Sequence, residues 1–513
     1  MSMQDNVRVI LLISVIQLLF SLRSVLAADG GCLTEQTLPM TGERIVPIAS
    51  EAELQNAMGD LRAGDTLLLA NGVYNLTSSL YINGRDNVTI RGASGCSDVV
   101  LAGKGMDNSS YGNVEVGIWS NSRNTTIAHL TVRDTFDNSV IFNGGAQSPY
   151  LYSINLIDSG SQFIKANPTD AANGIGVDNG VVEYSRIEYT NGPPASASHA
   201  GGAGYFNGIS AHSARNWTLR KNLFRNLHNP DSSSYWWNPA VLFWNHSQNT
   251  ITENNTFINT DRAIAYGLTD ISGSDHTGGI IRNNFIYLVS GLMSSARKAD
   301  SDAQIIVWDS PSTRVFHNTL LTNANINLSI EFRFGTDGGE ARNNLADAPI
   351  GTRNGGTFTQ SGNYLNAIPA MFVEPASGNL HLLDNESTRE HVIDGVAAIA
   401  AVPTDIDGET RPYGAAADVG ADEFAAMLPV RVAGSPPAYY LTLSEAYSHT
   451  GTGGTIEARE FLFDEDVTLD RPIPVILQGG YDSSFSEKSG LTAIQGRLTV
   501  LSGSLTVEGV EIM

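Results

Sequence analysis

A short phrase with an asparagine near its centre recurs through the middle of the chain. Leu219–Phe224 (LRKNLF) returns as Ile281–Ile286 and as Val315–Leu320, and looser copies surround Asn255 and Asn344. Successive copies are separated by roughly 30 residues, within the range of roughly 20 to 50 residues that is typical of solenoid repeats. Because the phrases are short, rich in Val, Ile, Thr and Phe, and broken by Gly and Asn, each unit is predicted to consist of strands and turns.

The recurring asparagine is interpreted as a structural residue. If the units are coils of a parallel β-helix, stacking places one asparagine above the next at a tight turn, where each amide can bond to its neighbour. Such a ladder satisfies buried polar atoms that would otherwise cost about 1–3 kcal/mol each. We therefore predict an asparagine ladder at these positions, and not a functional site.

Residues 1–28 have the features of a signal peptide. Arg8 precedes an apolar run from Val9 to Phe20, and small residues follow, with cleavage expected after Ala27 or Ala28. The run is too short to cross a bilayer, and no later window is long and apolar enough. The sequence predicts an exported protein, secreted or at the cell surface, without a membrane-spanning segment. An anchored lipoprotein is the alternative.

The chain contains two cysteines, Cys32 and Cys96. In an oxidising compartment they can form a disulfide that pins the N-terminal extension to an early coil. Two unpaired, buried thiols are the alternative.

Coils are expected from about residue 67 to residue 365. Ser50–Glu53 is a capping box that predicts a short amphipathic helix, with Leu54, Ala57 and Leu61 at helical spacing. A helix over the first coil would protect an open strand edge. After the coils the periodicity decays, so the β-helix domain is assigned to residues 29–424.

The C-terminal segment, residues 429–513, repeats the order of the beginning of the coils. Leu443–Ala446, Gly451–Ile456 and Arg471–Gly479 correspond to the cap helix, the first strand and a later strand. We predict a linker at 425–437 and a small β module at 438–513. The module is either a separate β unit or a truncated second β-helix.

The balance of acidic and basic residues limits the classes of partner that the protein is expected to bind. The chain has 53 acidic and 30 basic residues, a formal net charge of −23. Nothing resembles a basic stripe, so a nucleic-acid partner is not expected. An acidic polysaccharide would need a local cluster of Arg and Lys, or a bridging cation. A monomer is expected.

With its signal peptide, cap helix and asparagine-bearing coils, the chain resembles the right-handed parallel β-helix, or pectin-lyase-like, superfamily of secreted bacterial proteins. The resemblance covers about residues 47–424, and Asp405–Phe424 is similar to the segment that ends many such proteins. It implies an all-β solenoid with an N-terminal capping helix. Members include polysaccharide lyases, glycoside hydrolases, uronan epimerases and surface proteins without known catalysis, so the fold alone does not fix the activity.

Motifs of individual families are missing. The paired Asp-Asp and the Gly-His-Gly of polygalacturonase-like hydrolases are absent, as is the Asp-Pro-His-Asp of alginate epimerases. The Lys and Arg motifs of known β-helix lyases find no convincing match. Asp405-x-Asp407-Gly408 looks like the start of a calcium loop, but the rest of the loop is missing, so a turn is the better interpretation. No cofactor or metal is expected; calcium is conceivable but unsupported.

One strand of each coil offers a way to find a site without a motif. It reads apolar-x-apolar-polar and ends at a nearly constant distance before the asparagine, as in Ile209–His212 and Val241–Trp244. Side chains alternate along a strand, so the final polar or aromatic residue points outward. The predicted outward column comprises Trp119, Asn143, Asp178, His212, Trp244, Trp308 and Arg333. Exposed aromatic faces suit sugar rings, so these residues are candidate substrate contacts. The alternative is that loops cover the column and bury its rings.

A lyase acting on a uronic acid needs a base for the C5 proton, a cation beside the carboxylate and an acid for the leaving oxygen. His212 or Lys165 is the candidate base and Tyr266 the candidate proton donor. The candidate cations are Arg262, Arg297 and Arg333. Taken singly, each of these cations is better interpreted as an ordinary solvated loop residue.

Three functions follow in order. The first is a lyase on a uronate-containing polysaccharide, and the second is a non-catalytic surface protein that binds glycan or serves as a stalk. The third is a glycoside hydrolase, which needs two carboxylates roughly 5 to 10 Å apart. The available carboxylates for that chemistry are Asp178, Asp261, Asp300, Asp302 and Glu331.

Overall fold

The computed structural model describes residues 31–34, 36–194, 204–233, 235–424, 428–434, 437–482, 485, 487, 488 and 490–513. The chain divides into two compact units, with the boundary after Phe424. The predicted signal peptide, residues 1–28, lies outside the described residues.

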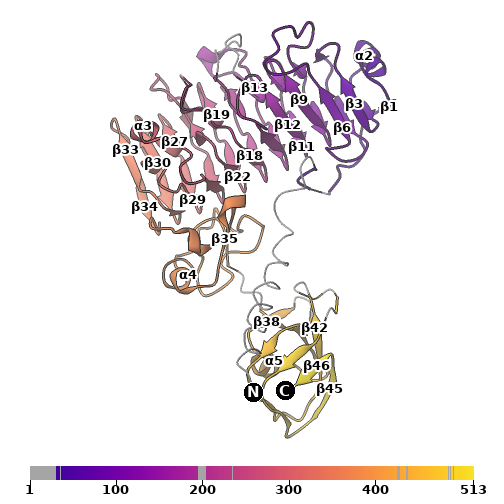
Figure 1. The fold of residues 1–513 in the computed structure, drawn as a ribbon, viewed down its shortest axis with the longest axis vertical. Helices are drawn as coiled ribbons and strands as arrows, with labels where there is room; N and C mark the ends of the chain where they lie inside the picture. Colours follow the sequence, from indigo (N-terminus) through magenta and orange to yellow (C-terminus); the bar gives the residue numbers. More distant parts are fainter. Residues whose placement is uncertain are drawn as a thin grey trace, which may run out of the picture. The chain divides into compact units, whose positions relative to one another are not determined.

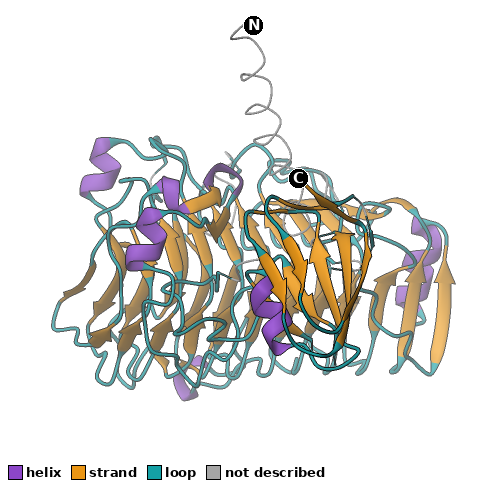
Figure 2. Cartoon of the chain, turned by 90° about the horizontal axis from the view of Figure 1, so that it is seen from below, coloured by secondary structure: helices purple, strands orange, loops and turns teal. Residues whose placement is uncertain are grey.

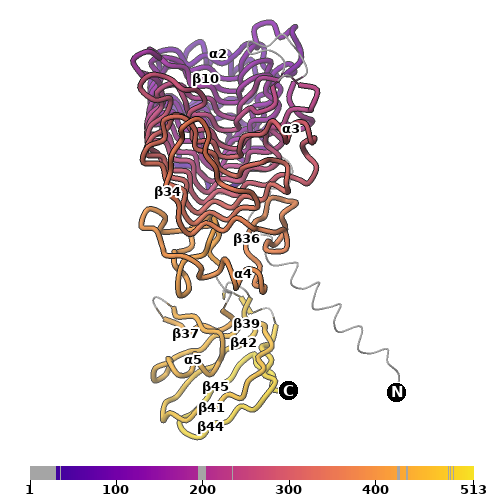
Figure 3. Tube along the Cα trace, turned by 90° about the vertical axis from the view of Figure 1, so that its left-hand side faces the viewer, coloured from indigo at the N-terminus to yellow at the C-terminus, as the bar shows by residue number. Residues whose placement is uncertain are grey.

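The first unit is a parallel β-helix (Figures 1 and 3). Each complete coil adds one strand to each of three parallel sheets, which we name A, B and C in the order in which the chain visits them. Sheet A contains β1 (Arg44–Ile48), β2 (Asp65–Leu69), β5 (Thr89–Gly92), β8 (Thr126–Ala128), β11 (Tyr150–Tyr152), β14 (Val181–Glu183), β17 (Thr218–Arg220), β21 (Ile251–Glu253), β25 (Ile280–Arg282), β28 (Arg314–Phe316), β31 (Glu340–Arg342) and β34 (Thr359–Ser361).

Sheets B and C each contain ten strands. Sheet B contains β3 (Gly72–Asn75), β6 (Val99–Ala102), β9 (Thr131–Thr135), β12 (Asn155–Ser159), β15 (Arg186–Glu188), β18 (Leu223–Arg225), β22 (Thr256–Ile258), β26 (Phe285–Tyr287), β29 (Thr319–Leu321) and β32 (Leu345–Ala346). Sheet C contains β4 (Leu80–Ile82), β7 (Ile118–Ser120), β10 (Val140–Phe142), β13 (Ile164–Ala166), β16 (Ile209–His212), β19 (Pro239–Trp244), β23 (Arg262–Tyr266), β27 (Ala303–Trp308), β30 (Leu328–Arg333) and β33 (Ile350–Arg353).

Strands dominate the chain, and helices are few and short (Figure 2). Alternate side chains of each strand point into the coil and stack on the same position of the next coil, because parallel pairing keeps one register. The interior column of sheet C illustrates this, with Ile209, Val241, Ile264, Ile305 and Ile330 in register and fully buried. The all-β, parallel β-helix class predicted from the sequence is confirmed.

The asparagine ladder is present and is longer by one member than predicted. The side-chain amide of each asparagine donates to the side-chain oxygen of the next, at 2.9 to 3.0 Å. The same oxygen also accepts the backbone N–H of the preceding ladder residue. The ladder consists of Asn222, Asn255, Asn284, Asn318, Asn344 and Asn363.

The residue before each of the first five ladder asparagines turns the chain sharply. Lys221, Asn254, Asn283, His317 and Asn343 have positive φ angles of 50° to 56°. This left-handed conformation is unfavourable for most residues and is tolerated best by Gly, Asn and Asp. The recurring Asn-Asn pair therefore combines a turn residue with an inward ladder residue.

Helix α2 (Glu51–Gly59) covers the first coil, as predicted. Its N-cap Ser50 accepts the backbone N–H of Glu53 at 3.3 Å, and Glu53 reaches back to the backbone N–H of Ala49 at 2.8 Å. In a capping box the second bond goes to the backbone N–H of the N-cap residue itself. Here it goes to Ala49, the residue before the N-cap, so only the Ser50 half of the predicted capping box is present.

Cys32 and Cys96 form a disulfide, which ties the N-terminal segment to the coils. Leu38 strengthens this attachment, because its N–H lies 3.1 Å from His129 Nε2 and its carbonyl accepts from Arg91. The predicted pairing of the two cysteines is therefore confirmed.

The end of this unit folds over the outer face of sheet B. Leu380, Leu382 and Val419 pack there against Phe285 and Leu345. The elements of this segment are η2 (Pro369–Met371), β35 (Phe372–Glu374), η3 (Pro375–Ser377), β36 (Asn379–Leu382) and α4 (Glu386–His391). Strands β35 and β36 are antiparallel.

Residues 405–408 form a turn. Asp405 Oδ1 accepts the backbone N–H groups of Asp407, Gly408 and Glu409 at 2.7 to 3.0 Å. Four short elements of the coils remain to be named. They are η1 (Ala171–Asn173), α3 (Ser295–Ala299) and the paired strands β20 (Ser247–Gln248) and β24 (His276–Thr277).

The second unit has the pattern of a short β-helix with its own helix, α5 (Leu443–His449). Three parallel sheets recur: β39 (Thr455–Arg459), β42 (Pro474–Tyr481) and β45 (Ser504–Glu508); β40 (Leu462–Phe463), β43 (Thr492–Ile494) and β46 (Val510–Ile512); β41 (Val467–Leu469) and β44 (Leu498–Val500). Two antiparallel strands, β38 (Ala438–Tyr440) and β37 (Val430–Val432), extend the first sheet. Strand β37 lies within the range predicted as linker, 425–437, so the folded unit starts earlier than expected.

No helix in the described residues is both long and apolar enough to span a bilayer.

Candidate functional site

The outer face of sheet C carries two parallel columns of side chains. Strand register aligns His212 with Trp244 and Trp308 with Arg333 and Arg353, which are the final residues of their strands. The second column lies two residues earlier along each strand. Its members, in spatial order, are Tyr81, Trp119, Ile141, Lys165, Ser210, Leu242, Ala265, Ile306 and Glu331.

Lys165 and His212 meet on neighbouring strands of this face. Lys165 Nζ lies 2.8 Å from His212 Nε2 and 3.3 Å from Ser210 Oγ. Strands β13 and β16 are neighbours in the sheet, so the hydrogen-bonded backbone sets this distance. Both side chains are only partly exposed. No carboxylate in the described part of the chain lies within ion-pair distance of the Lys165 amine.

Burial shifts both groups toward their neutral forms. It lowers the pKa of Lys165 to about 8, and the charge of Asp137 opposes this shift. It also lowers the pKa of His212 to about 3, with a further contribution from the positive charge of Lys165. Desolvation disfavours a cation because the protein interior solvates charge poorly. A lysine with such a pKa is a suitable general base near neutral pH, whereas His212 is neutral there and weakly basic.

Asn245 and Trp244 complete the surroundings of this pair. Asn245 Nδ2 lies 2.7 Å from His212 Nδ1, and the rings of His212 and Trp244 are 4.6 Å apart. The indole N–H of Trp244 is buried without a hydrogen-bond partner among the described residues. An unpaired donor of this kind is unusual and can be satisfied by a ligand or by water.

The strand alignment predicted for the outward column holds for most of its members. His212, Trp244, Trp308 and Arg333 each end a strand of sheet C. Asn143 directly follows β10, as Asn167 follows β13, and the Asn167 amide donates to Asn143 Oδ1 at 2.7 Å.

The alignment is wrong at Trp119 and Asp178. Trp119 lies in the other column, partly exposed, with its ring 5.9 Å from that of Tyr81. Asp178 lies outside sheet C, in the turn before β14, where it accepts the backbone N–H of Arg215 at 3.0 Å. Neither side chain is therefore in line with His212.

Trp308 is outward-facing, as predicted, but it is covered. Its side chain is 6% exposed, and its indole N–H donates to Glu331 at 2.7 Å. The guanidinium groups of Arg262, Arg333 and Arg353 lie 4.5 to 5.7 Å from its ring. The ring also belongs to an apolar cluster on this face. The alternative in which the ring is buried therefore holds for Trp308.

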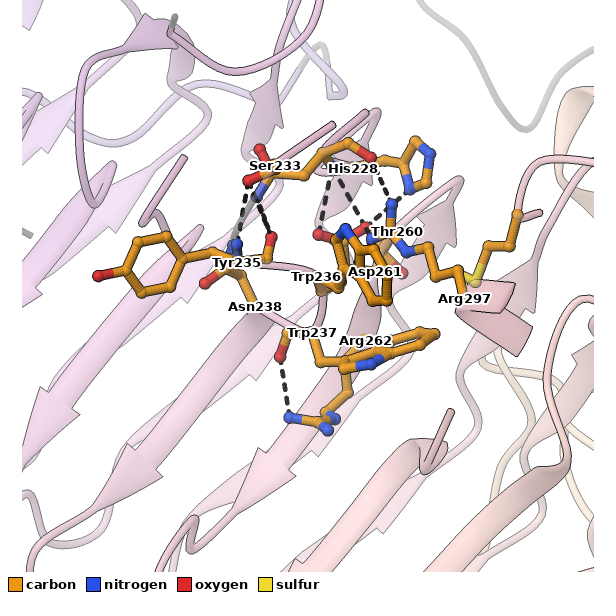
Figure 4. Close-up of polar contacts among 12 residues, drawn as sticks. His228, Ser233, Tyr235, Trp236, Trp237, Asn238, Thr260, Asp261, Arg262 and Arg297 are labelled. Carbon is orange, nitrogen blue, oxygen red and sulfur yellow. Dashed lines mark hydrogen bonds and ion pairs between the residues drawn. The ribbon is translucent and has the colours of Figure 1, made fainter. Parts of the chain in front are cut away.

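Arg297 is a structural residue and does not face sheet C as a free cation (Figure 4). It is fully buried, forms an ion pair with Asp261, and donates to the carbonyls of Asn229 and Trp236. His228 Nδ1 also lies 2.7 Å from Asp261. This network anchors the segment after His228 to helix α3.

Arg262 is likewise engaged. Its guanidinium binds Asp302 at 2.5 Å and the Trp237 carbonyl at 2.9 Å, and the side chain is nearly buried (Figure 4). Arg353 binds both Asp302 and Glu331, so two carboxylates proposed for a hydrolase are held by arginines. Asp261 is held in the same way by Arg297.

Tyr266 points into the coil, which contradicts its predicted role as proton donor. It is fully buried, and its hydroxyl lies 3.0 Å from Thr252 Oγ1 and 3.3 Å from the Ile280 carbonyl. Burial raises the pKa of Tyr266 well above its usual value. Residues 264 and 266 are both inward because side chains alternate along β23.

Arg333 is the one predicted cation that remains partly exposed. Its Nε donates to Asn354 at 2.8 Å, and its guanidinium lies over Trp308 and Phe334. It is four strands from His212, or about 19 Å at the usual spacing of about 4.8 Å between strands. The structure therefore brings Lys165 and His212 together and leaves the predicted cations elsewhere.

Sequence reasoning missed Ser210, Asn245, Tyr81 and Arg353. Ser210 and Tyr81 have the same strand offset as Lys165, so an alignment of the strands could have found them. Asn245 follows the strand, at a turn with a positive φ of 51°, and no repeat marks it as a site residue.

The coils, the three parallel sheets and the ladder define the chain as a parallel β-helix protein. No protein-family profile and no curated relative matches the sequence. Among solved structures, the pectate lyase Pel9A is similar, with a TM-score of 0.45 and 12% identity over 75% of this chain and 97% of the other. An alginate lyase from Paenibacillus sp. strain FPU-7 has a TM-score of 0.39 and 16% identity, covering 63% and 95%. The Dettilon tailspike protein has a TM-score of 0.34 and 11% identity, covering 59% and 64%.

Proposed function

We propose that this protein is a carbohydrate-active β-helix protein that binds a polysaccharide across the outer face of sheet C and cleaves it by β-elimination at a uronate. Lys165 is the base that removes the C5 proton, and His212 holds the amine in place. The C4–O bond then breaks, and solvent water supplies the proton of the leaving oxygen. The observation that carries the proposal is the contact of Lys165 with His212, 2.8 Å apart, in surroundings that lower the pKa of Lys165 to about 8.

The contact between Lys165 and His212 would lower the stability of the fold if it had only a structural role. A partly buried amine without a carboxylate partner destabilises the fold when it is protonated. Perturbed titratable groups of this kind concentrate at functional sites. The flanking aromatic residues fit an extended glycan. Trp119 and Tyr81 lie two and three strands to one side of Lys165, and Trp244 lies one strand beyond His212 on the other.

A second candidate function is glycan binding without catalysis. It is favoured by the engagement of Arg262 and Arg297 in ion pairs and by the distance of Arg333 from Lys165. Because these arginines are paired or distant, none of them lies beside Lys165 to neutralise the carboxylate of a bound substrate. A bound cation brought with the substrate would serve the same purpose.

We further propose that the protein is exported. The disulfide between Cys32 and Cys96 supports this location, because disulfides persist mainly in oxidising compartments.

Incubation with a panel of uronate-containing and neutral polysaccharides tests the proposal. A lyase produces unsaturated uronate, which is followed by its ultraviolet absorbance. Reducing ends without that absorbance would contradict the lyase and indicate a hydrolase. Retention of a glycan on immobilised protein without either product would support the binding function instead.

A further inference from the structure

A histidine and two aspartates converge on the segment that covers the outer face of sheet B. His381 lies on β36, Asp407 lies within the turn that begins at Asp405, and Asp422 lies near the end of the first unit. One ligand atom from each residue lies within 4.8 Å of the other two. The sequence does not predict a metal site here, because the three residues are far apart along the chain and match no ligand motif.

The imidazole of His381 is held in an orientation suited to a ligand. Its Nδ1 lies 2.6 Å from Asn379 Oδ1. The backbone N–H of His381 donates to the same oxygen at 3.2 Å, which identifies that atom as the acceptor of the amide. Nδ1 must therefore carry the proton. Metal-binding histidines are commonly oriented by such an outer hydrogen bond, which leaves the other nitrogen to bind the ion.

Nε2, the second nitrogen of this ring, faces the carboxylates. Asp407 Oδ2 lies 2.7 Å from it. Asp422 is 5% exposed, and its Oδ2 accepts the backbone N–H of Leu382 at 2.8 Å. The site thus offers one nitrogen and two carboxylates from three separate stretches of chain.

Two other charged groups nearby, Arg411 and Asp405, are already engaged in hydrogen bonds or ion pairs. Arg411 binds Glu423 at 2.7 Å and the carbonyls of Asp418 and Gly420. Asp405 accepts four backbone N–H groups, three from its own turn and one from Glu423. A buried carboxylate is stable only when it is paired, protonated or bound to a metal. When Nε2 binds an ion, His381 is neutral, and the two positive charges of a divalent cation balance both aspartates.

We propose that His381, Asp407 and Asp422 bind a divalent transition-metal ion of the zinc type. Zn²⁺ accepts one imidazole nitrogen and carboxylate oxygens at four-coordinate sites, and water can take the remaining position. Ca²⁺ prefers six to eight oxygen ligands, so the imidazole disfavours it. The ion would fasten β36 to the segment 405–422 on the outer face of sheet B. This inference is independent of the function proposed for sheet C.

Isothermal titration of ZnCl2 into EDTA-treated, tag-free protein tests the inference. The expected result is one saturable equivalent of Zn²⁺ and a higher melting temperature in its presence. Asp407→Asn and Asp422→Asn should each weaken binding tenfold or more, and His381→Gln should do the same. Asn379→Ala should weaken it roughly 10- to 100-fold through loss of the outer hydrogen bond.

His391→Gln is the matched control, because His391 lies in the same segment on α4, outside the cluster, and should leave binding unchanged. Asp407 is exposed, so its variant should fold even if Asp422→Asn does not. Absence of saturable Zn²⁺ binding by the unaltered protein would overturn the inference. Unchanged affinity in folded Asp407→Asn and His381→Gln would overturn it as well, because the ion would then bind elsewhere. Tighter binding of Ca²⁺ than of Zn²⁺ would also contradict it.

Discussion

Lys165 Nζ and His212 Nε2 lie 2.8 Å apart on adjacent strands of sheet C, and burial lowers the pKa of both. Two bases in contact cannot both be protonated without repulsion, so each favours the neutral form of the other. At neutral pH the amine is still largely protonated, because its pKa of about 8 lies above that pH. The fold therefore carries a poorly solvated cation, which has consequences for both stability and activity.

Lys165→Met should stabilise the protein and abolish turnover. Met has a similar length and no charge, so it removes the desolvation penalty. At pH 7 we expect a gain of roughly 2 kcal/mol in the free energy of unfolding, since one pKa unit equals about 1.4 kcal/mol and the site retains some solvent. Urea titration followed by far-ultraviolet circular dichroism measures the gain.

The gain should depend on pH in a defined direction. The folded-state pKa of Lys165, about 8, is below the ordinary lysine value of 10.5, so the unfolded chain binds more protons between these values. The penalty is fully present below pH 8 and disappears as the pH rises toward 10.5. Lys104→Met, at an exposed lysine, is the control and should change neither stability nor turnover. A loss of stability in Lys165→Met would mean that the amine has a structural role.

The pH dependence of turnover should identify Lys165 as the base. A base acts when it is deprotonated, so the rate should rise with pH and level off above about 8. His212→Ala should admit water to the Lys165 amine and so raise its pKa. The pH range in which the rate rises should therefore move to higher pH. His212, whose pKa is about 3, would be the base if the rate instead rose near pH 3 and His212→Ala removed that rise. The rate is read from the absorbance of unsaturated uronate.

Two of the three tryptophans predicted to contact sugar, Trp244 and Trp308, should behave differently. Trp308 is buried under arginines, so Trp308→Ala should cost about 3–5 kcal/mol of stability, the usual result of emptying a large aromatic site. Trp244 is partly exposed beside His212. Trp244→Ala should cost less stability and weaken glycan binding by about 1–3 kcal/mol, by analogy with aromatic stacking on bases. Thermal melting and glycan affinity electrophoresis separate the two effects. Equal stability losses would contradict this assignment.

The strand register of sheet C could be predicted from the sequence because the ladder asparagines fix it. His212, Trp244, Trp308 and Arg333 keep a nearly constant distance to their asparagines, and each ends its strand as expected. The prediction that Asp178 belongs to the outward column of sheet C is wrong because an insertion separates the strand from the turn in its coil. The strand of that coil ends at Ala166, and the loop 167–180 returns the chain to sheet A. The repeat does not set the length of this loop, so the spacing to the repeat could not place Asp178 correctly.

The state of the charged residues could not be predicted, because their partners are distant in sequence. Arg297 meets Asp261 from 36 residues away, and Arg262 meets Asp302 from 40 residues away. Whether a loop arginine is free or buried depends on how two loops pack, and the repeat pattern carries no information about this. The prediction that Tyr266 is a proton donor is wrong for a simpler reason. Its strand alternates in and out, and the nearby Ile264 already marks the inward positions.

The position of an asparagine in the ladder should determine its contribution to stability. Asn284 lies in the middle, where its amide donates to the Thr252 carbonyl and to Asn318, and its oxygen accepts two N–H groups of Asn255. Asn284→Ala leaves these buried groups without partners, at about 1–3 kcal/mol each. We expect a loss of at least about 2 kcal/mol in the free energy of unfolding.

Asn363 is the matched control because it is the last member of the ladder and is only partly buried. Water can replace part of what Asn363→Ala removes, so this variant should lose about half as much stability as Asn284→Ala. Denaturant titrations of the two variants under identical conditions provide the comparison. If the two losses were equal, the hydrogen bonds of the ladder would contribute to stability independently of their burial. A larger loss at Asn284 would instead show that the stacked amides stabilise the coils by satisfying each other's buried hydrogen-bonding groups.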